Sequence, residues 1–260
     1  MFASLRNHWP EYLIEASTLG LFMISACTFC LLLEHPDSLL RQQLEAPLAR
    51  RVLMGVAMGL TAIAIIYSPW GKRSGAHMNP AVTLTFLRLG KIAPPDAGFY
   101  LAAQFIGGLT GILLARRFFG AALDVPQVQY VATVPGLYGT IGALIGEFVI
   151  SFGIMTTVLI ASNSRRFEKW TGIYAGGLIA LYISLEAPLS GMSMNPARTL
   201  GSALPAGIYT GLWVYFVAPL AGMLAAGELF VRTRGASAIK CAKLAHRGAR
   251  TCIFRCNYHT

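Results

Sequence analysis

The chain has few charged residues, and acidic residues are the scarcest among them. Its 260 residues include 11 Asp and Glu against 21 Lys and Arg, so that charged residues make up only 12% of the sequence. Soluble domains carry about 25% charged residues. Because the chain is also 55% hydrophobic, a soluble domain is not expected. No nucleophile–base arrangement and no metal-ligand spacing stands out, so an enzyme is not expected either.

Cysteine is scarce as well, and its placement indicates neither a disulfide framework nor a zinc framework. Cys27 and Cys30 lie within an apolar stretch, whereas Cys241, Cys252 and Cys256 lie near the C-terminus. We therefore predict no metal ligands and no cofactor.

Long apolar stretches are what the chain does contain. Six of them are long enough, at roughly 18–22 residues, to cross about 30 Å of hydrocarbon as helices. They cover residues 12–33, 51–69, 97–116, 139–161, 171–188 and 210–231. The first is too long for the apolar region of a signal peptide and carries Glu15, so we expect it in the mature protein. Glycines four residues apart, such as Gly55 and Gly59, favour close helix packing.

The tripeptide Asn79-Pro80-Ala81 recurs as Asn195-Pro196-Ala197, and both copies follow a Ser-Gly flank. An Asn followed by Pro is a typical helix start, because the Asn oxygen caps a free backbone N–H and Pro fits the first helical position. Helix-competent residues follow each copy, which predicts half helices over 80–89 and 196–204. At about 1.5 Å per residue each covers about 15 Å, so the two end to end make one more crossing.

These segments predict an all-α integral membrane protein, a right-handed bundle of six transmembrane helices with two re-entrant half helices. Because each repeat has three crossings, the second is inverted relative to the first. Glu15 and Glu147 hold matching positions, and we expect them to accept hydrogen bonds from loop backbone rather than to relay protons. The predicted divisions are an N-terminal segment (1–11), a first repeat (12–117), an extracellular connecting loop (118–138), a second repeat (139–231) and a basic tail (232–260).

Most Lys and Arg residues fall on the side of the membrane that would hold both termini, so the positive-inside rule predicts cytoplasmic termini. The same bias accounts for the net charge of +10, and no nucleic-acid partner is expected. Contact of the tail with anionic lipid is one interpretation. A solvated tail is the interpretation that we favour. The short connecting loops suggest a plasma (inner) membrane of bacterial type.

The strings Ser74–Thr83 and Met194–Arg198 resemble those of the aquaporin (major intrinsic protein) family. The similarity runs through roughly residues 10–231 and includes Ala103-Gln104 in the third crossing and Trp213-Val214-Tyr215 in the sixth. This resemblance implies a passive pore in each subunit for water, small neutral solutes or both. It also implies a homotetramer in membrane lipid, without a cofactor.

The two half helices would meet at their N-termini, where each places about half a positive charge at the membrane centre. Cations then meet a barrier that a neutral molecule does not. Asn79 and Asn195 would cap with their oxygens and leave their NH₂ groups to orient a passing water, which breaks a proton wire. Arg198 is the one cation expected in the pore, at the outer mouth. His77 is expected to pack or hydrogen-bond the re-entrant loop rather than to act as a gate.

The resemblance places the other three positions of the selectivity filter on Met58, Ile183 and Met192. The position of Met58 depends on one extra residue within 68–73, so the adjacent positions stay open. Water-selective members typically have an aromatic residue and His in this ring. Glycerol-conducting members have a small residue where Ile183 stands, two aromatics, and Asp where Thr199 follows the arginine.

This ring matches neither subclass, so water, glycerol, urea, hydrogen peroxide, ammonia and metalloid acids all stay candidates. Water is slightly favoured because Ile183 is bulky, and the flexible methionines leave the pore diameter open. A secondary transporter also uses inverted repeats and broken helices, but no carboxylate accompanies the central Asn pair. A structural, adhesive role is the other alternative. Glu186 is assigned to the outer vestibule or to a feature of this chain alone.

Overall fold

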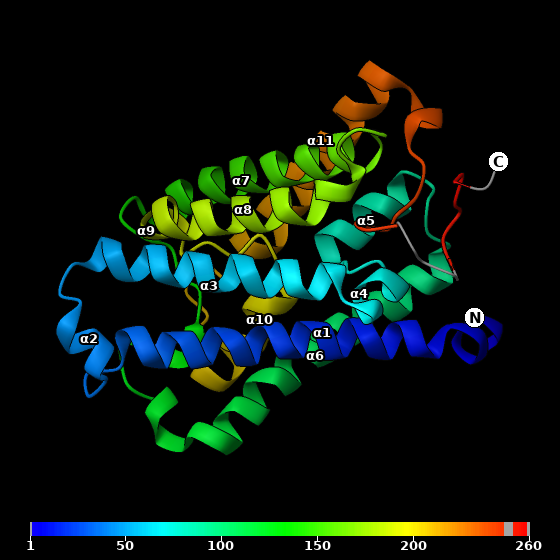
Figure 1. The fold of residues 1–260 in the computed structure, drawn as a ribbon. Helices are drawn as coiled ribbons and strands as arrows, with labels where there is room; N and C mark the ends of the chain where they lie inside the picture. Colours follow the sequence, from blue (N-terminus) through cyan, green and yellow to red (C-terminus); the bar gives the residue numbers. More distant parts are fainter. Residues whose placement is uncertain (1, 247–251, 259–260) are drawn as a thin grey trace.

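The structure is a computed structural model that describes residues 2–246 and 252–258. Within this part the chain is helical and contains no strand. Six long helices run side by side through the bundle in Figure 1: α1 (Phe2–Glu34), α3 (Pro47–Tyr67), α6 (Pro94–Phe119), α7 (Gly139–Ser162), α8 (Thr171–Leu185) and α11 (Val214–Arg234). Together with two half helices they give the predicted architecture of six crossings and two re-entrant segments.

Five of these helices in the described part are long and apolar enough to span a membrane, and α8 is the exception. The sequence predicted this crossing over 171–188, but α8 has 15 residues and ends at Leu185. A separate turn, α9 (Ala187–Ser190), follows it. Pro188 has no N–H to donate to the carbonyl of Ser184, so the helical ladder breaks at this point.

The half helices are α5 (Pro80–Arg88) and α10 (Pro196–Ala206). The predicted end of the second one before Pro205 is wrong, because α10 includes this proline. The residue after the helix, Gly207, has a left-handed conformation with a φ of 66°. Its N–H donates to the carbonyls of Ala203 and Leu204 in the last turn. Glycine adopts this conformation without the steric cost that a Cβ imposes.

The two repeats pack in matching ways. α1 lies against α6 in the first repeat and α7 lies against α11 in the second, while α3 and α8 join the repeats. Each half helix packs on the last crossing of the other repeat, α5 on α11 and α10 on α6. The bundle therefore has the pseudo-symmetry that the inverted repeat predicts.

Small residues let α3 and α8 approach closely. A Cβ on Gly59 would lie 2.5 Å from the carbonyl oxygen of Gly176, and one on Gly55 would lie 2.4 Å from that of Ala180. Real Cβ atoms do not come so close, so larger residues would push the two helices apart. This interface joins the two repeats and forms one wall of the bundle centre.

Short elements connect the long ones. At one end of the bundle, α2 (Leu39–Gln43) and α9 lie on the side away from the termini (Figure 1). The segment between the repeats forms two 3-10 turns, Gly120–Leu123 and Gln129–Val131. The other connecting elements are α4 (Pro69–Ser74) and the 3-10 turns Glu168–Trp170 and Ala236–Ala238.

The two ends of the chain lie at the same end of the bundle (Figure 1). α1 begins at Phe2, so the predicted N-terminal segment forms part of the first long helix. The favoured interpretation of a solvated tail is wrong for the described residues. Ile239, Cys241 and Ala242 are buried, as is the ring of Phe254. The Leu244 N–H donates to the carbonyl of Gly75 at 3.2 Å. Apolar residues interspersed among the basic ones let this segment pack on the bundle.

Candidate functional site

Two buried glutamates hold the re-entrant loops that precede the half helices. Glu15 accepts hydrogen bonds from the His77 N–H at 3.0 Å and the Met78 N–H at 2.6 Å. Glu147 does the same for the Ser193 and Met194 N–H groups, both at 2.6 Å. A buried carboxylate that accepts such bonds fixes loop backbone which lipid cannot satisfy. Both glutamates thus accept hydrogen bonds from loop backbone, as we expected from the sequence.

The backbone of the two loops has the same unusual conformation. Ala76 and Met78 have positive φ values of 55° and 49°, and Met192 and Met194 have values of 52° and 54°. Left-handed conformations cost non-glycine residues roughly 1–2 kcal/mol each. They persist where surrounding contacts determine the backbone, and here the glutamates supply those contacts.

Asn79 and Asn195 lie at the N-termini of the half helices and cap them. The Asn79 side-chain oxygen accepts from the Ala81 N–H at 2.9 Å, and that of Asn195 accepts from the N–H groups of Ala197 and Arg198 at 3.0 and 3.2 Å. Both residues have the extended backbone that is typical of an N-cap. The expected capping role of the oxygens thus matches the geometry.

The amide groups of the same residues differ from the expectation in one respect. Each NH₂ donates one hydrogen to the opposite loop, Asn79 to the carbonyl of Met194 at 2.6 Å and Asn195 to that of Met78 at 2.7 Å. An amide has two such hydrogens, so one remains on each for a passing oxygen. These two reciprocal hydrogen bonds connect the two repeats at the centre of the bundle.

A cavity of about 360 Å³ passes between the repeats and contains every predicted filter position. Its wall includes both central asparagines, and most of its other members are apolar. The filter residues that line it are Met58, Ile183, Met192 and Arg198. They come from four different elements, α3, α8, the second re-entrant loop and α10.

Arg198 follows Asn195 in the first turn of α10 and faces this cavity. Its Nη1 atom is buried and has no hydrogen-bond partner among the described residues. A buried donor without a partner costs about 1–3 kcal/mol, and more when it is charged. A polar molecule in the cavity would accept the hydrogen bond that the protein leaves unmade.

His77 lies at the opposite end of the cavity wall. Its Nε2–H donates to the Ala242 carbonyl at 2.8 Å, and its Nδ1 lies 3.0 Å from Thr83 Oγ1. The ring stacks between Phe86 and Phe254, with centroids 5.3 Å away on either side. The side chain thus hydrogen-bonds the half helix that follows the re-entrant loop and the C-terminal segment, whereas we expected it to pack on or hydrogen-bond the loop itself.

Several residues of the cavity wall were missed from the sequence. Gln127, Val128 and Val131 of the connecting loop line it, and so does Leu244 of the tail. The sequence of a loop or of a basic tail does not indicate that its residues line a cavity, because this depends on how the segment packs on the bundle. Glu186, assigned above to the outer vestibule or to this chain alone, does not belong to the wall. It is buried between α8 and α9, and its carboxylate has no hydrogen-bond partner among the described residues.

The tail is anchored beside the loop between α7 and α8. The Tyr258 hydroxyl donates to the Ser162 carbonyl at 2.8 Å and lies 3.0 Å from the Glu168 carboxylate. Burial, together with the charge of Glu168, raises the pKa of Tyr258 above its usual value. The hydroxyl therefore stays protonated and remains a donor.

The structure also corrects the prediction that the cysteines form no metal-ligand group. Cys241, Cys252 and Cys256 lie together with His246, and their ligand atoms are all within 4.8 Å of one another. Cys252 and Cys256 are separated by three residues, an interval that occurs in zinc sites, but Cys241 and His246 join them only because the tail folds on the bundle. Cys27 and Cys30 lie apart from this group in α1.

Comparisons with known proteins agree with these features. Residues 3–230 match the family described as Major intrinsic protein. Putative aquaporin NIP4-1 of Arabidopsis thaliana is 34% identical over 75% of this chain and 71% of the relative. Aquaporin NIP2-3 of Zea mays is 37% identical over 72% of this chain, but the match spans only 60% of the relative. The aquaglyceroporin from Plasmodium falciparum has a similar fold, with a TM-score of 0.70 over 86% of this chain and 96% of that one, at 19% identity.

Proposed function

Because the chain belongs to the major intrinsic protein family, whose members are channels rather than enzymes, we propose that it is a passive channel for water and small neutral solutes. One observation carries this proposal. A single cavity is lined by Asn79, Asn195 and Arg198 and otherwise mainly by apolar side chains. The described wall also includes one carboxylate, Glu34, against two guanidinium groups, Arg51 and Arg198. Because Glu34 is paired with Arg50, the wall offers hydrogen bonds to a neutral molecule and a net positive charge to a cation.

Ions and protons are excluded at the centre. The two half helices begin at Asn79 and Asn195, so their positive dipole ends face the same part of the cavity. Each asparagine keeps one amide hydrogen for the oxygen of a permeating molecule. A water that accepts from both points its own hydrogens along the pore, and the chain of proton-conducting waters is interrupted.

Selection by size and polarity takes place at Met58, Ile183, Met192 and Arg198. Arg198 is the only hydrogen-bonding side chain of the four, and its Nη1 has no partner among the described residues. The three apolar members favour solutes with some apolar surface, and methionines adapt to differently shaped molecules. The ring therefore suits water together with small neutral solutes. The printed names of the relatives, aquaporins and an aquaglyceroporin, fit both kinds of permeant.

In the membrane, both termini face the cytoplasm, and the protein assembles as a homotetramer in the plasma (inner) membrane. The basic residues near the ends of α4 and α11 support this orientation, since Lys and Arg gather on the cytoplasmic side. Only the membership of the family supports the homotetramer. A coupled transporter is not favoured, because Glu34, the carboxylate of the described cavity wall, lies at the end of α1 and pairs with Arg50 at 3.1 Å.

Stopped-flow light scattering on proteoliposomes tests the proposal. Shrinkage under an impermeant osmolyte measures water permeability, and reswelling under glycerol measures solute permeability. We expect both rates to exceed those of empty liposomes, and Arg198→Ala to speed the reswelling. Arg88→Ala is the matched control, because Arg88 is an exposed arginine on the other half helix. Rates equal to those of empty liposomes under all conditions would overturn the channel.

A further inference from the structure

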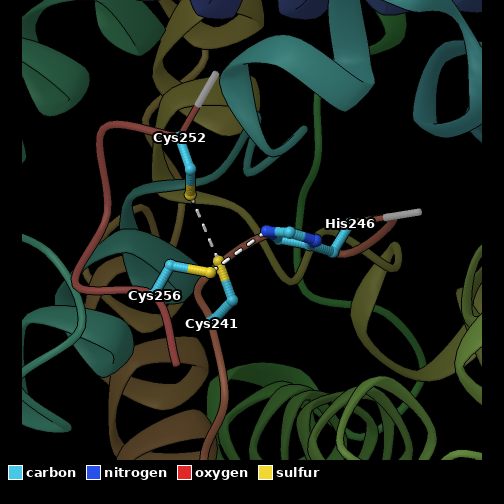
Figure 2. A group of neighbouring side chains, drawn as sticks. All are labelled: Cys241, His246, Cys252 and Cys256. Atoms are coloured by element: carbon cyan, nitrogen blue, oxygen red, sulfur yellow. Dashed lines mark hydrogen bonds between the residues drawn. The ribbon is translucent and has the colours of Figure 1, made fainter. Parts of the chain in front are cut away.

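The C-terminal segment gathers three thiols and one imidazole at a single point. Figure 2 shows Cys241, His246, Cys252 and Cys256 directed toward a common centre. Cys241 Sγ lies 3.5 Å from Cys252 Sγ, and Cys256 Sγ lies 3.1 Å from His246 Nε2. Nothing in the proposed channel function uses these four side chains.

This donor set is one of the common ligand sets of structural zinc. Zn²⁺ takes four ligands in a tetrahedron, and three Cys with one His is a frequent combination. With Zn–S bonds of about 2.3 Å, two sulfurs of such a tetrahedron lie about 3.8 Å apart. The 3.5 Å between Cys241 Sγ and Cys252 Sγ is close to that value, and all four ligand atoms lie within 4.8 Å of one another. Soft thiolates favour zinc over Mg²⁺ or Ca²⁺, which prefer oxygen ligands.

We propose that Cys241, His246, Cys252 and Cys256 bind one zinc ion, and that this ion holds the C-terminal segment across the mouth of the pore. The second half of this statement rests on the proposed channel function. The first half concerns metal binding alone and is tested without any measurement of flux.

Neighbouring contacts already fix the backbone that carries the ligands. The Lys240 N–H donates to Asn163 Oδ1 at 2.7 Å, and the Asn257 N–H donates to the Lys240 carbonyl at 2.8 Å. The ring of Tyr258 stacks on His246 with a centroid separation of 4.2 Å, which orients the imidazole. Such outer contacts position ligands in zinc sites. A metal would therefore enter a largely formed site.

The charge around the cluster suits bound thiolates. Zinc with three thiolates and a neutral histidine carries one net negative charge. Lys243, two residues after Cys241, is only 1% exposed, so the segment that carries the ligands also buries a positive charge. The negative charge of a zinc–thiolate group would suit this surrounding.

The residues between the first two ligands are the ones that contact the pore. The Ala242 carbonyl accepts from His77 Nε2, and Leu244 lines the cavity beside His77 and Asn79. The ring of Phe254, which lies between Cys252 and Cys256 in the sequence, packs against Gly75. A Cβ on Gly75 would lie only 2.9 Å from this ring. A metal bound by both Cys241 and His246 would fix the loop between them, and would thereby hold Leu244 at the mouth of the pore.

A disulfide is the competing use of these thiols. All five cysteines are free in the structure, and the 3.5 Å between Cys241 and Cys252 exceeds the roughly 2.05 Å of an S–S bond. A Cys241–Cys252 disulfide would also leave His246 and Cys256 without a function. Two thiols oxidised in the purified protein, with no bound metal, would favour this alternative.

Metal content is the first measurement. We expect the full-length protein, purified without chelators, to contain one zinc per chain by elemental analysis. Replacement by Co²⁺ should give the visible absorption of a tetrahedral thiolate site. Cys252→Ser and Cys256→Ser should lose the metal, and Cys27→Ala, which removes a buried thiol outside the cluster, should keep it. If the serine variants fail to fold, Co²⁺ titration of the wild-type chain still decides the matter. Absence of stoichiometric zinc and of the cobalt spectrum would overturn the site.

Flux is the second measurement. A strong zinc chelator should raise the water permeability of wild-type proteoliposomes severalfold, and added Zn²⁺ should reverse the change. Leu244→Ala should be permeable in both conditions while it still binds zinc. Bound zinc with a permeability that the chelator leaves unchanged would uphold the site and overturn its action on the pore. If the channel itself were wrong, no variant would conduct in any metal state, but the zinc content would be unaffected.

Discussion

Asn79 and Asn195 each donate a hydrogen bond to the loop that carries the other. The amide nitrogen of Asn79 lies 2.6 Å from the Met194 carbonyl oxygen, and that of Asn195 lies 2.7 Å from the Met78 carbonyl oxygen. Each side chain also caps its own half helix. The two asparagines thus connect the repeats as well as line the cavity, and a change at either affects both roles.

Replacement of Asn195 by Asp should admit cations. Aspartate keeps the capping oxygen but loses the donor to Met78, and its charge offsets the positive helix ends. We expect faster proton entry, followed with a pH-sensitive dye inside proteoliposomes. Asn7→Asp is the control, because Asn7 is an exposed residue of α1 and lies outside the cavity wall. An unchanged proton rate in Asn195→Asp would argue against exclusion at this point.

Glu147→Gln should destabilise the protein strongly. The carboxylate accepts three hydrogen bonds, from the Ser190 hydroxyl and from two loop N–H groups. Glutamine keeps one oxygen and presents an NH₂ to a donor, and a hydrogen bond to a charged group is worth about 1.5–3 kcal/mol. We expect a loss of about 3 kcal/mol, seen as a lower unfolding midpoint in detergent.

Glu228→Gln is the comparison for that loss. Glu228 pairs with Arg88 at 2.7 Å, and both side chains are more than one third exposed. An exposed pair of this kind contributes about 0–1 kcal/mol. Equal midpoints for the two variants would show that Glu147 does not hold the loop.

Ile183→Ala should widen the proposed filter. Ile183 lines the cavity together with Arg198, so a smaller side chain enlarges the space beside the guanidinium. We expect glycerol to permeate faster while the water rate changes little. Leu185→Ala serves as control, since Leu185 is 63% exposed on the outside of the bundle. If glycerol permeation did not respond to the residue at 183, the constriction would have to lie elsewhere.

Phe254→Ala should release the C-terminal segment without unfolding the bundle. The ring is buried, stacks on His77 and contacts Tyr100 edge-on at a centroid distance of 6.0 Å. Loss of a buried Phe side chain costs about 3–5 kcal/mol. Here this cost reduces the free energy with which the C-terminal segment docks on the bundle. Limited proteolysis with mass spectrometry should show cleavage after the basic residues of the tail at a higher rate. The unfolding midpoint of the helices should stay near that of the wild type.

The bundle was largely predictable because its determinants are local. Long apolar stretches indicate the number of crossings, and an Asn-Pro pair is typical of a helix start. Both glutamates stood out because a carboxylate within an apolar stretch needs a partner. The proposed filter positions came from the family resemblance, and all four residues line one cavity.

The tail and its cysteines could not be predicted, because their position depends on contacts distant in the sequence. Ala242 meets His77, and Tyr258 meets Ser162. The three-residue interval between Cys252 and Cys256 is a familiar zinc spacing, but it does not identify Cys241 and His246 as further ligands. Composition alone describes the segment as basic, and a basic segment usually lies in solvent. For the same reason the sequence did not reveal that Leu244 reaches the cavity.

The packing of each half helix on the other repeat sets the order in which the pore is built. α5 is synthesised early, but its partner α11 is the last crossing to leave the ribosome. The hydrogen bond of Asn79 also has to wait for the second repeat, because its acceptor, the carbonyl of Met194, lies there. Assembly of the pore is therefore a single late event in biogenesis. A nascent chain that stops before α11 still lacks the helix on which α5 packs.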